Sequence, residues 1–555
     1  MLGRSMLWFL LFAIGLALAG HSLEAQTVAG RQRDFSAADV RRGSITPERA
    51  WWDVKHYHLS LEVFPETKRL AGSNKITFLA KTDGQQMQID LQPPLAITRV
   101  LYDANELTFE RHGNYYLINF PRPLNAGLEA EIEIFYEGQP VEAKNPPWDG
   151  GITWTQDSQG HPFIASSCQG IGASVWWPCK DHGADEPDGG VVISLTVPKS
   201  LTGVANGRLV ETESDEAKPT RTFHWQVTYP INSYCVNMNV GRYVSFSETY
   251  QGAFGALDMQ YWVLDHQRDR AMQHFKEAPR VLEAFEYWFG KYPFYRDSYK
   301  LVAAPYLGME HQSGVTYGNG FQNGYQGRDL SGTGVGMLFD YIIVHESGHE
   351  WFGNNISMKD SADLWIHESF TDYAESLFVE YHFGKQQAAD YVIGLRKLIK
   401  NDRPIVGTYG VNHEGSGDMY YKGANLLHSL RQIVNDRERW RRILTGLNTK
   451  FRYQTVTSKQ VEDYLSEQTE IDLSAFFDQY LRTTKVPRFV FQVQGNQLIY
   501  RYENVVPGFA YPLVVNVNGK SYRIFPRENA QVVNFPMVIN SCEVDRNFYV
   551  ETIRR

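Results

Sequence analysis

Two stretches, VHESGHEWFGNN and the DLWIHESFTDYAES that follows it, constrain the fold of this chain more than any other feature. In a helix each residue turns by about 100°, so His345 and His349 lie one turn apart on the same face. Two imidazole nitrogens can then reach one ion. Glu368 follows nineteen residues after His349, where a second helix can return past the first and supply a carboxylate oxygen. The spacing therefore predicts two adjacent helices that share a metal ion.

Two histidines and one carboxylate leave a fourth position for water, which is the arrangement of catalytic rather than structural zinc. Glu346 is adjacent to the first ligand but is not needed for coordination, so it is free to take a proton from that water. We therefore predict one Zn²⁺ ion per chain, with His345, His349 and Glu368 as ligands and Glu346 as the general base.

The alternative is that HExxH is an ordinary helix surface that matches the motif by chance. The apolar run GMLFDYIIV before the motif argues against this, because it would bury the helix. The second segment places aromatic and aliphatic side chains at helical spacing, at Phe370, Tyr373, Leu377 and Tyr381. Two buried helices that carry His and Glu side chains towards each other require a compensating ion.

The first residues have the pattern of a secretory signal peptide. Arg4 precedes an apolar run over 6–19, which is shorter than the roughly 20 residues needed to span a bilayer. A cleavage point after Ala25 gives a signal peptide over 1–25. We expect an exported chain, periplasmic or secreted, without a membrane span after cleavage; an uncleaved membrane anchor is the alternative.

The expected export affects how the four cysteines are interpreted, because disulfides form in oxidising compartments outside the cytosol. Cys168 and Cys179 are close enough in sequence to close a small loop by a disulfide in an oxidising compartment. Cys235 and Cys542 are interpreted as buried thiols.

Composition and pattern indicate several domains. A length of 555 residues with 43% hydrophobic content is enough for more than one core, and a net charge of -9 argues against nucleic acid as a main partner. Short alternating strands dominate from Trp51 to Val244, helices follow, and strands return after Pro487. We predict an antiparallel β N-terminal domain and a mixed helical domain followed by a small β-sandwich, with boundaries at 26–248, 249–487 and 488–555.

HESGHEWFGN and WIHESF, with PYLGMEH upstream and YYKG downstream, resemble the aminopeptidase N family of zinc metallopeptidases, which includes leukotriene hydrolase. HYHLSLEVFPETKRLAGSNKITF and YPINSYCVNMNVGRY are similar to that family's first domain. The resemblance implies a multidomain α+β protein whose catalytic domain is thermolysin-like α/β. It also implies a small β-sandwich before a large helical domain. Since the sequence stops after the predicted sandwich, that helical domain is expected to be absent.

The resemblance implies roles for individual residues. His345, His349 and Glu368 match the family's metal ligands, and Glu346 matches its general base. In PYLGMEH, Glu310 matches the glutamate that binds the free α-amino group of the substrate, and Met309 is placed beside it in the substrate site. This motif departs from the family pattern at Leu307 and His311, where the family usually has glycine and asparagine.

Two further assignments come from the resemblance, and each has an alternative. Gln169 in SSCQGIGASVWWPC resembles the glutamine that also holds the substrate amine, but it can instead be a turn residue. Tyr420 matches the tyrosine of the Tyr-x-Lys-Gly motif, which stabilises the oxyanion; the adjacent Tyr421 is the alternative. The function that follows is a zinc aminopeptidase acting on peptides with a free N-terminus. Hydrolysis of a lipid epoxide on the same zinc, or a non-catalytic peptide-binding role, are the alternatives.

Overall fold

The structure is a computed structural model that describes residues 35–555. The predicted signal peptide and its cleavage point therefore lie outside the described residues. Within 35–555, no helix is both long enough and apolar enough to cross a membrane.

The N-terminal domain is built on an eight-stranded sheet in the order β13-β14-β11-β1-β2-β8-β4-β5. Its central strand β1 (Trp52–Phe64) alternates buried and half-buried residues, as expected for a strand with one face on a core. β1 pairs antiparallel with β2 (Arg69–Ala80) but parallel with β11 (Val191–Pro198), so the predicted antiparallel arrangement has one exception. The other strands are β4 (Ala96–Tyr102), β5 (Asn105–Glu106), β8 (Glu129–Gly138), β13 (Arg208–Ser214) and β14 (Thr220–Val227).

Two smaller sheets complete this domain. One has the order β3-β7-β6 and the other β12-β15-β10-β9. β10 matters for the site, because it ends at Ser167, directly before Cys168 and Gln169. The strands are β3 (Gly84–Asp90), β6 (Thr108–His112), β7 (Tyr115–Leu124), β9 (Gly151–Gln156), β10 (Pro162–Ser167), β12 (Thr202–Val204) and β15 (Asn239–Gly241).

The next sheet has the order β16-β17-β18-β20-β19, and all its strands come before the two motif helices in the chain. β19 (Gly308–Met309) pairs with β20 (Val315–Tyr317), and this hairpin places Glu310 directly after the strand. The domain boundary predicted between 248 and 249 falls inside β16 (Tyr243–Gly252). The remaining strands are β17 (Gly255–Leu264) and β18 (Tyr299–Ala303).

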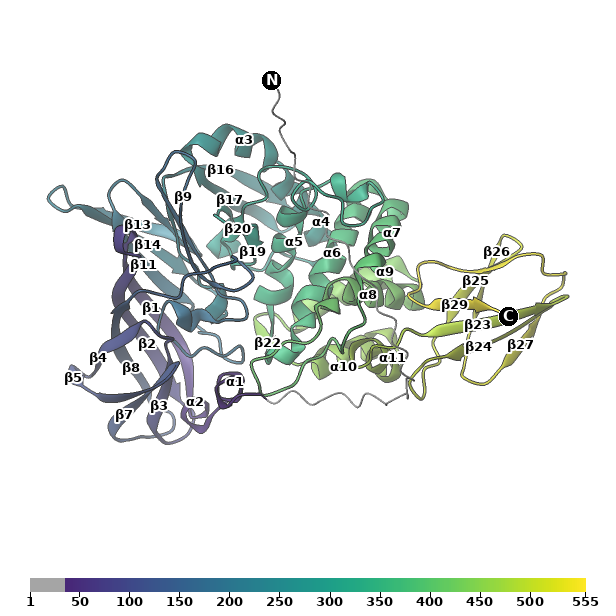
Figure 1. Cartoon of the computed structure of the whole chain (residues 1–555), viewed down its shortest axis with the longest axis horizontal. Coiled ribbons are helices and arrows are strands. Elements are labelled where there is room, and N and C mark those ends of the chain that lie inside the picture. The colour runs from purple at the N-terminus through teal and green to yellow at the C-terminus, as the bar shows by residue number, and fades with distance from the viewer. Residues whose placement is uncertain (1–34) are drawn as a thin grey trace, which may run out of the picture. The chain divides into compact units, whose positions relative to one another are not determined.

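Helices α5 (Tyr341–Gly348) and α6 (Trp365–Phe383) carry the two motifs and pack against each other (Figure 1). α5 begins at Asp340, whose side chain accepts hydrogen bonds from the backbone N–H groups of Ile342 and Ile343. α6 is buried on all sides from Trp365 to Glu380. Its acidic residues therefore require partners inside the protein.

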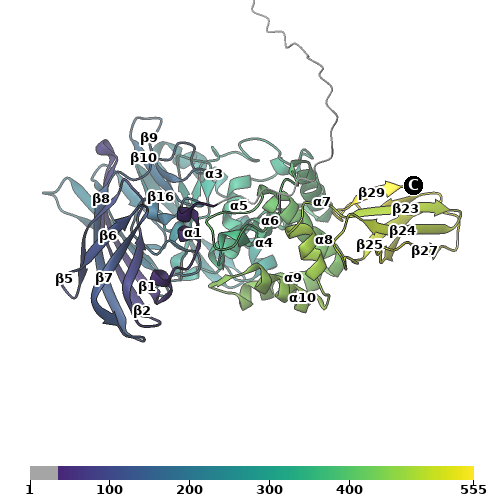
Figure 2. The same ribbon diagram turned by 60° about the horizontal axis from the view of Figure 1, so that its bottom comes forward.

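Several other helices pack around this pair (Figures 1 and 2). α4 (Glu277–Phe289), α7 (Lys385–Gly394) and α8 (Tyr421–Val434) all contact α6. The remaining helices are α1 (Ala37–Gly43), α2 (Pro47–Ala50), α3 (Arg268–His274), α9 (Arg437–Lys450), α10 (Ser458–Thr469) and α11 (Ser474–Leu481). A short strand pair, β21 (Ile356–Met358) with β22 (Gln454–Val456), links the segment between α5 and α6 to the one between α9 and α10.

The C-terminal residues form the predicted small β-sandwich. One sheet has the order β27-β24-β23-β29 and the other β26-β25-β28. The strands are β23 (Arg488–Gln494), β24 (Gln497–Glu503), β25 (Leu513–Val517), β26 (Lys520–Ile524), β27 (Gln531–Asn534), β28 (Cys542–Val544) and β29 (Glu551–Arg554).

All four cysteines are buried and free. The sequence left open whether Cys168 and Cys179 form a disulfide, and in the structure they do not. Closeness in sequence allows a disulfide, but the bond also requires a specific relative position of the two side chains. The prediction of buried thiols at Cys235 and Cys542 is confirmed.

Candidate metal centre and substrate-binding site

The motif helix α5 ends at Gly348, directly before the second histidine of the motif. His349 follows the last residue of α5, and the chain then leaves helical geometry at Phe352 and at Gly353, which has φ 133°. Only glycine adopts such a φ readily, and a Cβ atom on Gly353 would lie 3.2 Å from His349 Nδ1. The break leaves the carbonyl oxygen of Phe352 2.9 Å from His349 Nδ1. With Nδ1 donating there, His349 Nε2 is left as an acceptor.

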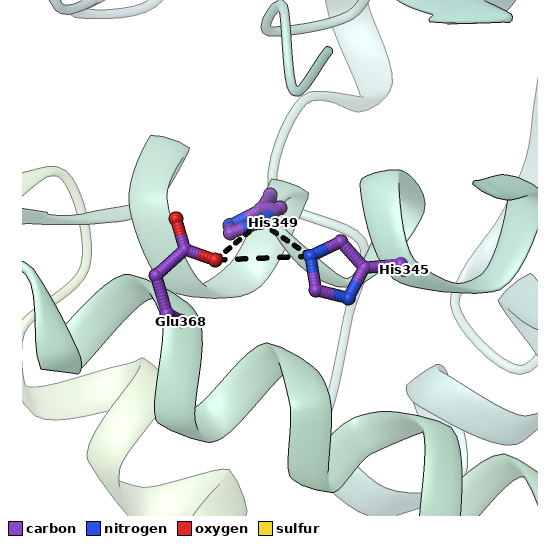
Figure 3. A group of neighbouring side chains, drawn as sticks. All are labelled: His345, His349 and Glu368. Atoms are coloured by element: carbon purple, nitrogen blue, oxygen red, sulfur yellow. Dashed lines mark hydrogen bonds and ion pairs between the residues drawn. The ribbon is translucent and has the colours of Figure 1, made fainter. Parts of the chain in front are cut away.

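His345, His349 and Glu368 point towards one another from the two helices (Figure 3). The two Nε2 atoms are 3.3 Å apart, and Glu368 Oε2 lies 3.7 Å from His345 Nε2 and 3.5 Å from His349 Nε2. Ligands at about 2.0–2.1 Å in a tetrahedral site are separated by roughly 3.4 Å, so these distances match three corners around one zinc ion. Glu368 Oε2 is buried and accepts no hydrogen bond from any residue in 35–555. The trio therefore fits a zinc ion.

A further carboxylate, Glu375, orients the first histidine, and the sequence analysis missed it. Glu375 Oε1 lies 2.7 Å from His345 Nδ1, and Tyr391 Oη donates to Glu375 Oε2 at 2.6 Å. Such a partner fixes the tautomer and ring orientation of a metal-binding histidine. The sequence could have predicted this role, because Glu375 follows Glu368 by seven residues. It therefore lies two turns further along the same face of α6.

Glu346 lies beside the trio. Its carboxylate packs against Gly308 of β19, where an added Cβ atom would be 2.9 Å from Glu346 Oε1. Oxygens of Glu346 and Glu310 and a nitrogen of His349 all fall within 4.8 Å of one another. Burial raises the pKa of Glu346 to about 7, which is suitable for a group that accepts and returns a proton.

Glu310 and Gln169 meet next to the metal centre although they come from different domains. Gln169 Nε2 donates to Glu310 Oε1 at 2.7 Å and to Glu368 Oε1 at 3.1 Å. Tyr234 Oη also donates to Glu310 Oε1, at 3.1 Å. The side chain of Gln169 therefore points into the site. This holds even if its backbone also forms the turn that was the alternative interpretation. Tyr234 was missed as a site residue, although it stands in the YPINSYCVNMNVGRY segment.

The segment around Glu310 is buried. Glu310 is 3% exposed, and burial raises the pKa of its carboxyl group. The side chain of Met309 is buried, and its carbonyl oxygen accepts a hydrogen bond from Thr316 Oγ1 at 3.3 Å. The two departures from the family pattern, Leu307 and His311, are also buried. His311 Nδ1 lies 3.3 Å from the same Thr316 hydroxyl.

Of the two adjacent tyrosines, Tyr420 lies against the trio. Its ring stacks on that of His345, with centroids 6.1 Å apart. Burial and the carboxylates of Glu368 and Glu310 raise the pKa of Tyr420 well above its usual value, so its hydroxyl remains a donor. The pKa of Tyr421 is raised by burial and by the carboxylates of Asp372 and Glu375, whereas Glu368 and Glu310 are the carboxylates that act on Tyr420.

The β domain and the helix pair with a two-histidine, one-carboxylate group define a metallopeptidase. The sequence matches the Peptidase M1 N-terminal domain over residues 53–235 and the Peptidase family M1 domain over residues 273–480. The chain therefore belongs to peptidase family M1. Residues 488–555 lie outside both matched regions.

The relatives that this sequence matches are named as aminopeptidases or as leukotriene A-4 hydrolase. The chain is 22% identical to a probable aminopeptidase 1 of Sulfurisphaera tokodaii over 89% of its own length, and 23% identical to leukotriene A-4 hydrolase of Xenopus laevis over 76%. The matches span 62% and 68% of those two proteins. The chain thus matches less than two thirds of the first of these relatives.

Solved structures share the fold. An M1 zinc metallopeptidase from Deinococcus radiodurans, in a mutant form bound to a Tyr-Ser-Ala substrate, has a TM-score of 0.65 at 20% identity, covering 78% of this chain and 95% of that one. A two-domain M1 zinc metallopeptidase bound to L-tryptophan has a TM-score of 0.64 at 21% identity, covering 76% and 91%.

Proposed function

We propose that this protein is a zinc aminopeptidase that releases N-terminal amino acids from peptides. The observation that carries the proposal is the contact of Glu310 and Gln169 at 2.7 Å, directly beside the trio that fits zinc. A carboxylate and an amide at this position form a recess for a cation next to the reacting bond.

The recess selects the end of a peptide. Glu310 can accept hydrogen bonds from the substrate ammonium group, and the carbonyl oxygen of the Gln169 amide can accept another. An ammonium group held there places the first peptide bond at the metal centre. An interior peptide bond has no ammonium group to offer, and it would leave the buried Glu310 carboxylate without a cationic partner. Exopeptidase activity therefore suits the site better than endopeptidase activity.

The proposal also assigns roles to the remaining side chains. Zinc, when bound by His345, His349 and Glu368, polarises the scissile carbonyl and lowers the pKa of water towards 7. Glu346 accepts a proton from the attacking water and delivers it to the leaving amine. The hydroxyl of Tyr420 donates to the carbonyl oxygen as negative charge develops there.

The test is hydrolysis of aminoacyl arylamides by a protein that spans residues 26–555. We expect turnover that a chelator abolishes and zinc restores. Glu346→Gln should retain zinc and lose turnover. N-acetylated arylamides should be poor substrates, and equal rates on free and acetylated forms would refute the amine recess.

A second candidate is hydrolysis of a lipid epoxide, which the relative named leukotriene A-4 hydrolase brings into consideration. An epoxide substrate assayed beside the arylamide panel separates the two. Turnover of the epoxide with no arylamide hydrolysis would replace the first proposal. A zinc-loaded protein that binds peptides without turnover would instead indicate a non-catalytic relative.

Export of the protein also stands as a proposal, because it rests on the pattern over 1–25. N-terminal sequencing of the protein from its native source tests it. A mature chain that starts at Gln26 supports cleavage after Ala25, and a chain that keeps Arg4 indicates an uncleaved leader.

A further inference from the structure

Three buried side chains form a chain of hydrogen bonds that ends on the carboxylate of the amine recess. Tyr234 Oη donates to Glu310 Oε1 at 3.1 Å, and His367 Nδ1 lies 3.4 Å from the same hydroxyl. At the far end of the chain, His367 Nε2 lies 2.7 Å from the backbone nitrogen of Met358. Tyr234, His367 and Glu310 are all buried, so water does not compete strongly for these bonds.

The direction of each hydrogen bond in this chain follows from the groups that make it. The backbone N–H of Met358 can only donate, so His367 Nε2 is the acceptor and carries no proton. The ring is then neutral with its proton on Nδ1, and Nδ1 donates to the hydroxyl of Tyr234. The carboxylate of Glu310 accepts, so the hydroxyl donates to it. Every proton in the chain therefore points towards Glu310.

The two oxygens of Glu310 are not equivalent. Oε1 accepts from Tyr234 Oη and, at 2.7 Å, from Gln169 Nε2. Oε2 accepts no hydrogen bond from another residue in 35–555, and it is not one of the fully buried atoms that lack a partner. Oε2 is therefore the oxygen that is open to a ligand, and a carboxylate oxygen there can accept from an ammonium group.

The backbone of Glu310 is held by other side chains. Asn354 Nδ2 donates to the carbonyl oxygen of Glu310 at 2.9 Å, and Cys235 Sγ donates to Asn354 Oδ1 at 3.0 Å. Loss of the Tyr234 hydroxyl would therefore loosen the carboxylate and leave the backbone in place. A glutamate side chain has several rotatable bonds, so a carboxylate that is already fixed loses less conformational entropy when an ammonium group binds.

We propose that Tyr234 and His367 are positioning residues of the amine recess, which hold Glu310 Oε1 so that Oε2 is presented to the α-ammonium group of the substrate. The inference rests on the proposed function, because it takes Glu310 as the group that binds this amine. Tyr234 belongs to the turn η3 (Ser233–Cys235) of the N-terminal domain, whereas His367 belongs to α6 and directly precedes the metal ligand Glu368. Both domains therefore set the position of one carboxylate.

The test is isothermal titration calorimetry of the zinc-loaded protein over residues 26–555 with two probes. L-leucine hydroxamate carries an α-amine, and 4-methylpentanohydroxamate is the same molecule without it. The ratio of their dissociation constants reports on the amine recess and requires no turnover. In the parent we expect the amine to strengthen binding about tenfold or more, as for a charge-assisted hydrogen bond. Equal binding of the two probes to the parent would refute the recess itself, and this inference with it.

Variants of the two residues test the chain. Tyr234→Phe should weaken L-leucine hydroxamate about three- to tenfold and leave 4-methylpentanohydroxamate within about twofold. On arylamides it should raise KM by the same factor, with a smaller change in kcat.

His367 can be replaced in two ways. His367→Asn places an amide nitrogen about where Nδ1 lies and keeps a donor to Tyr234, so it should bind both probes as the parent does. His367→Gln reaches to the position of Nε2 and loses that donor, so it should match Tyr234→Phe. The double variant Tyr234→Phe/His367→Gln should lose no more than either single variant, because both changes break one chain.

Tyr261→Phe is the matched control. Tyr261 is also buried, and its hydroxyl donates to a carboxylate, that of Glu248 at 2.6 Å, but neither residue belongs to the site. It should bind both probes as the parent does. The positioning role would be overturned if Tyr234→Phe kept the full preference of the parent for the amine, weakened both probes equally, or lost no more of that preference than Tyr261→Phe. Equal behaviour of His367→Asn and His367→Gln would remove His367 from the chain.

Discussion

Gln169 and Glu310 are 141 residues apart in sequence, yet Gln169 Nε2 lies 2.7 Å from Glu310 Oε1. Gln169 follows β10 of the N-terminal domain, and Glu310 follows β19 of the next sheet. The same amide group reaches Glu368 at 3.1 Å. The N-terminal domain therefore contributes directly to the site and does more than support the catalytic helices.

Replacing the carboxylate of this pair should impair recognition of the substrate amine. For Glu310→Gln we expect kcat/KM on free aminoacyl arylamides to fall by about 10- to 100-fold, mainly through KM, because a charge-assisted hydrogen bond is worth about 1.5–3 kcal/mol. Steady-state kinetics measures this. The residual rate on an N-acetylated arylamide is the control, and an equal fall there would show a general structural defect.

Loss of the orienting carboxylate should weaken metal binding. Glu375→Gln keeps the size of the side chain but offers His345 Nδ1 a weaker acceptor, or a donor. We expect zinc affinity to fall by about 10- to 100-fold, measured by competition with a chromophoric chelator.

A matched control for this prediction is Glu286→Gln. Glu286 is also a buried glutamate that accepts a tyrosine hydroxyl, from Tyr295 at 2.7 Å, but none of its hydrogen bonds involves a metal ligand. Similar losses of zinc in both variants would contradict a specific role for Glu375.

The two adjacent tyrosines should differ in their effect on turnover. Tyr420→Phe removes the hydroxyl of the ring that stacks on His345, and we expect kcat to fall by about 10²- to 10³-fold with little change in KM. Tyr421→Phe should leave kcat within a few-fold of the parent. The reverse result in a stopped or continuous arylamide assay would assign the oxyanion role to Tyr421.

Acid should destabilise the fold through His428, a buried histidine that is not one of the proposed metal ligands. Burial lowers the pKa of His428 to about 4, against 6.5 for the free side chain. The unfolded chain therefore binds this proton first as the pH falls. The stabilising contribution is complete above pH 6.5, and it is lost at about 1.4 kcal/mol per pH unit as the pH falls towards 4.

Urea unfolding at pH 7 and pH 5.5 measures this effect when the parent is compared with His428→Gln. The parent should lose about 1.4 kcal/mol more than the variant between the two pH values, because the other histidines titrate in both proteins. Equal losses would show that His428 is not kept neutral by the fold.

The sequence by itself determined the features that depend on local spacing. His345 and His349 share a helix face because they are four residues apart. The alternation of β1 and the strands after Pro487 predicted the β domain and the sandwich for the same reason. The family resemblance then pointed to Glu310 and Tyr420.

Only the tertiary structure decided which distant residues meet. It paired β1 with β11 in parallel, left Cys168 and Cys179 unbonded, and placed Glu375 behind His345. It also brought Gln169 to Glu310. A local pattern fixes the direction of a side chain within its own helix or strand, because backbone geometry repeats every few residues. The neighbour that the side chain meets depends on how separate elements pack, and that is a property of the whole chain.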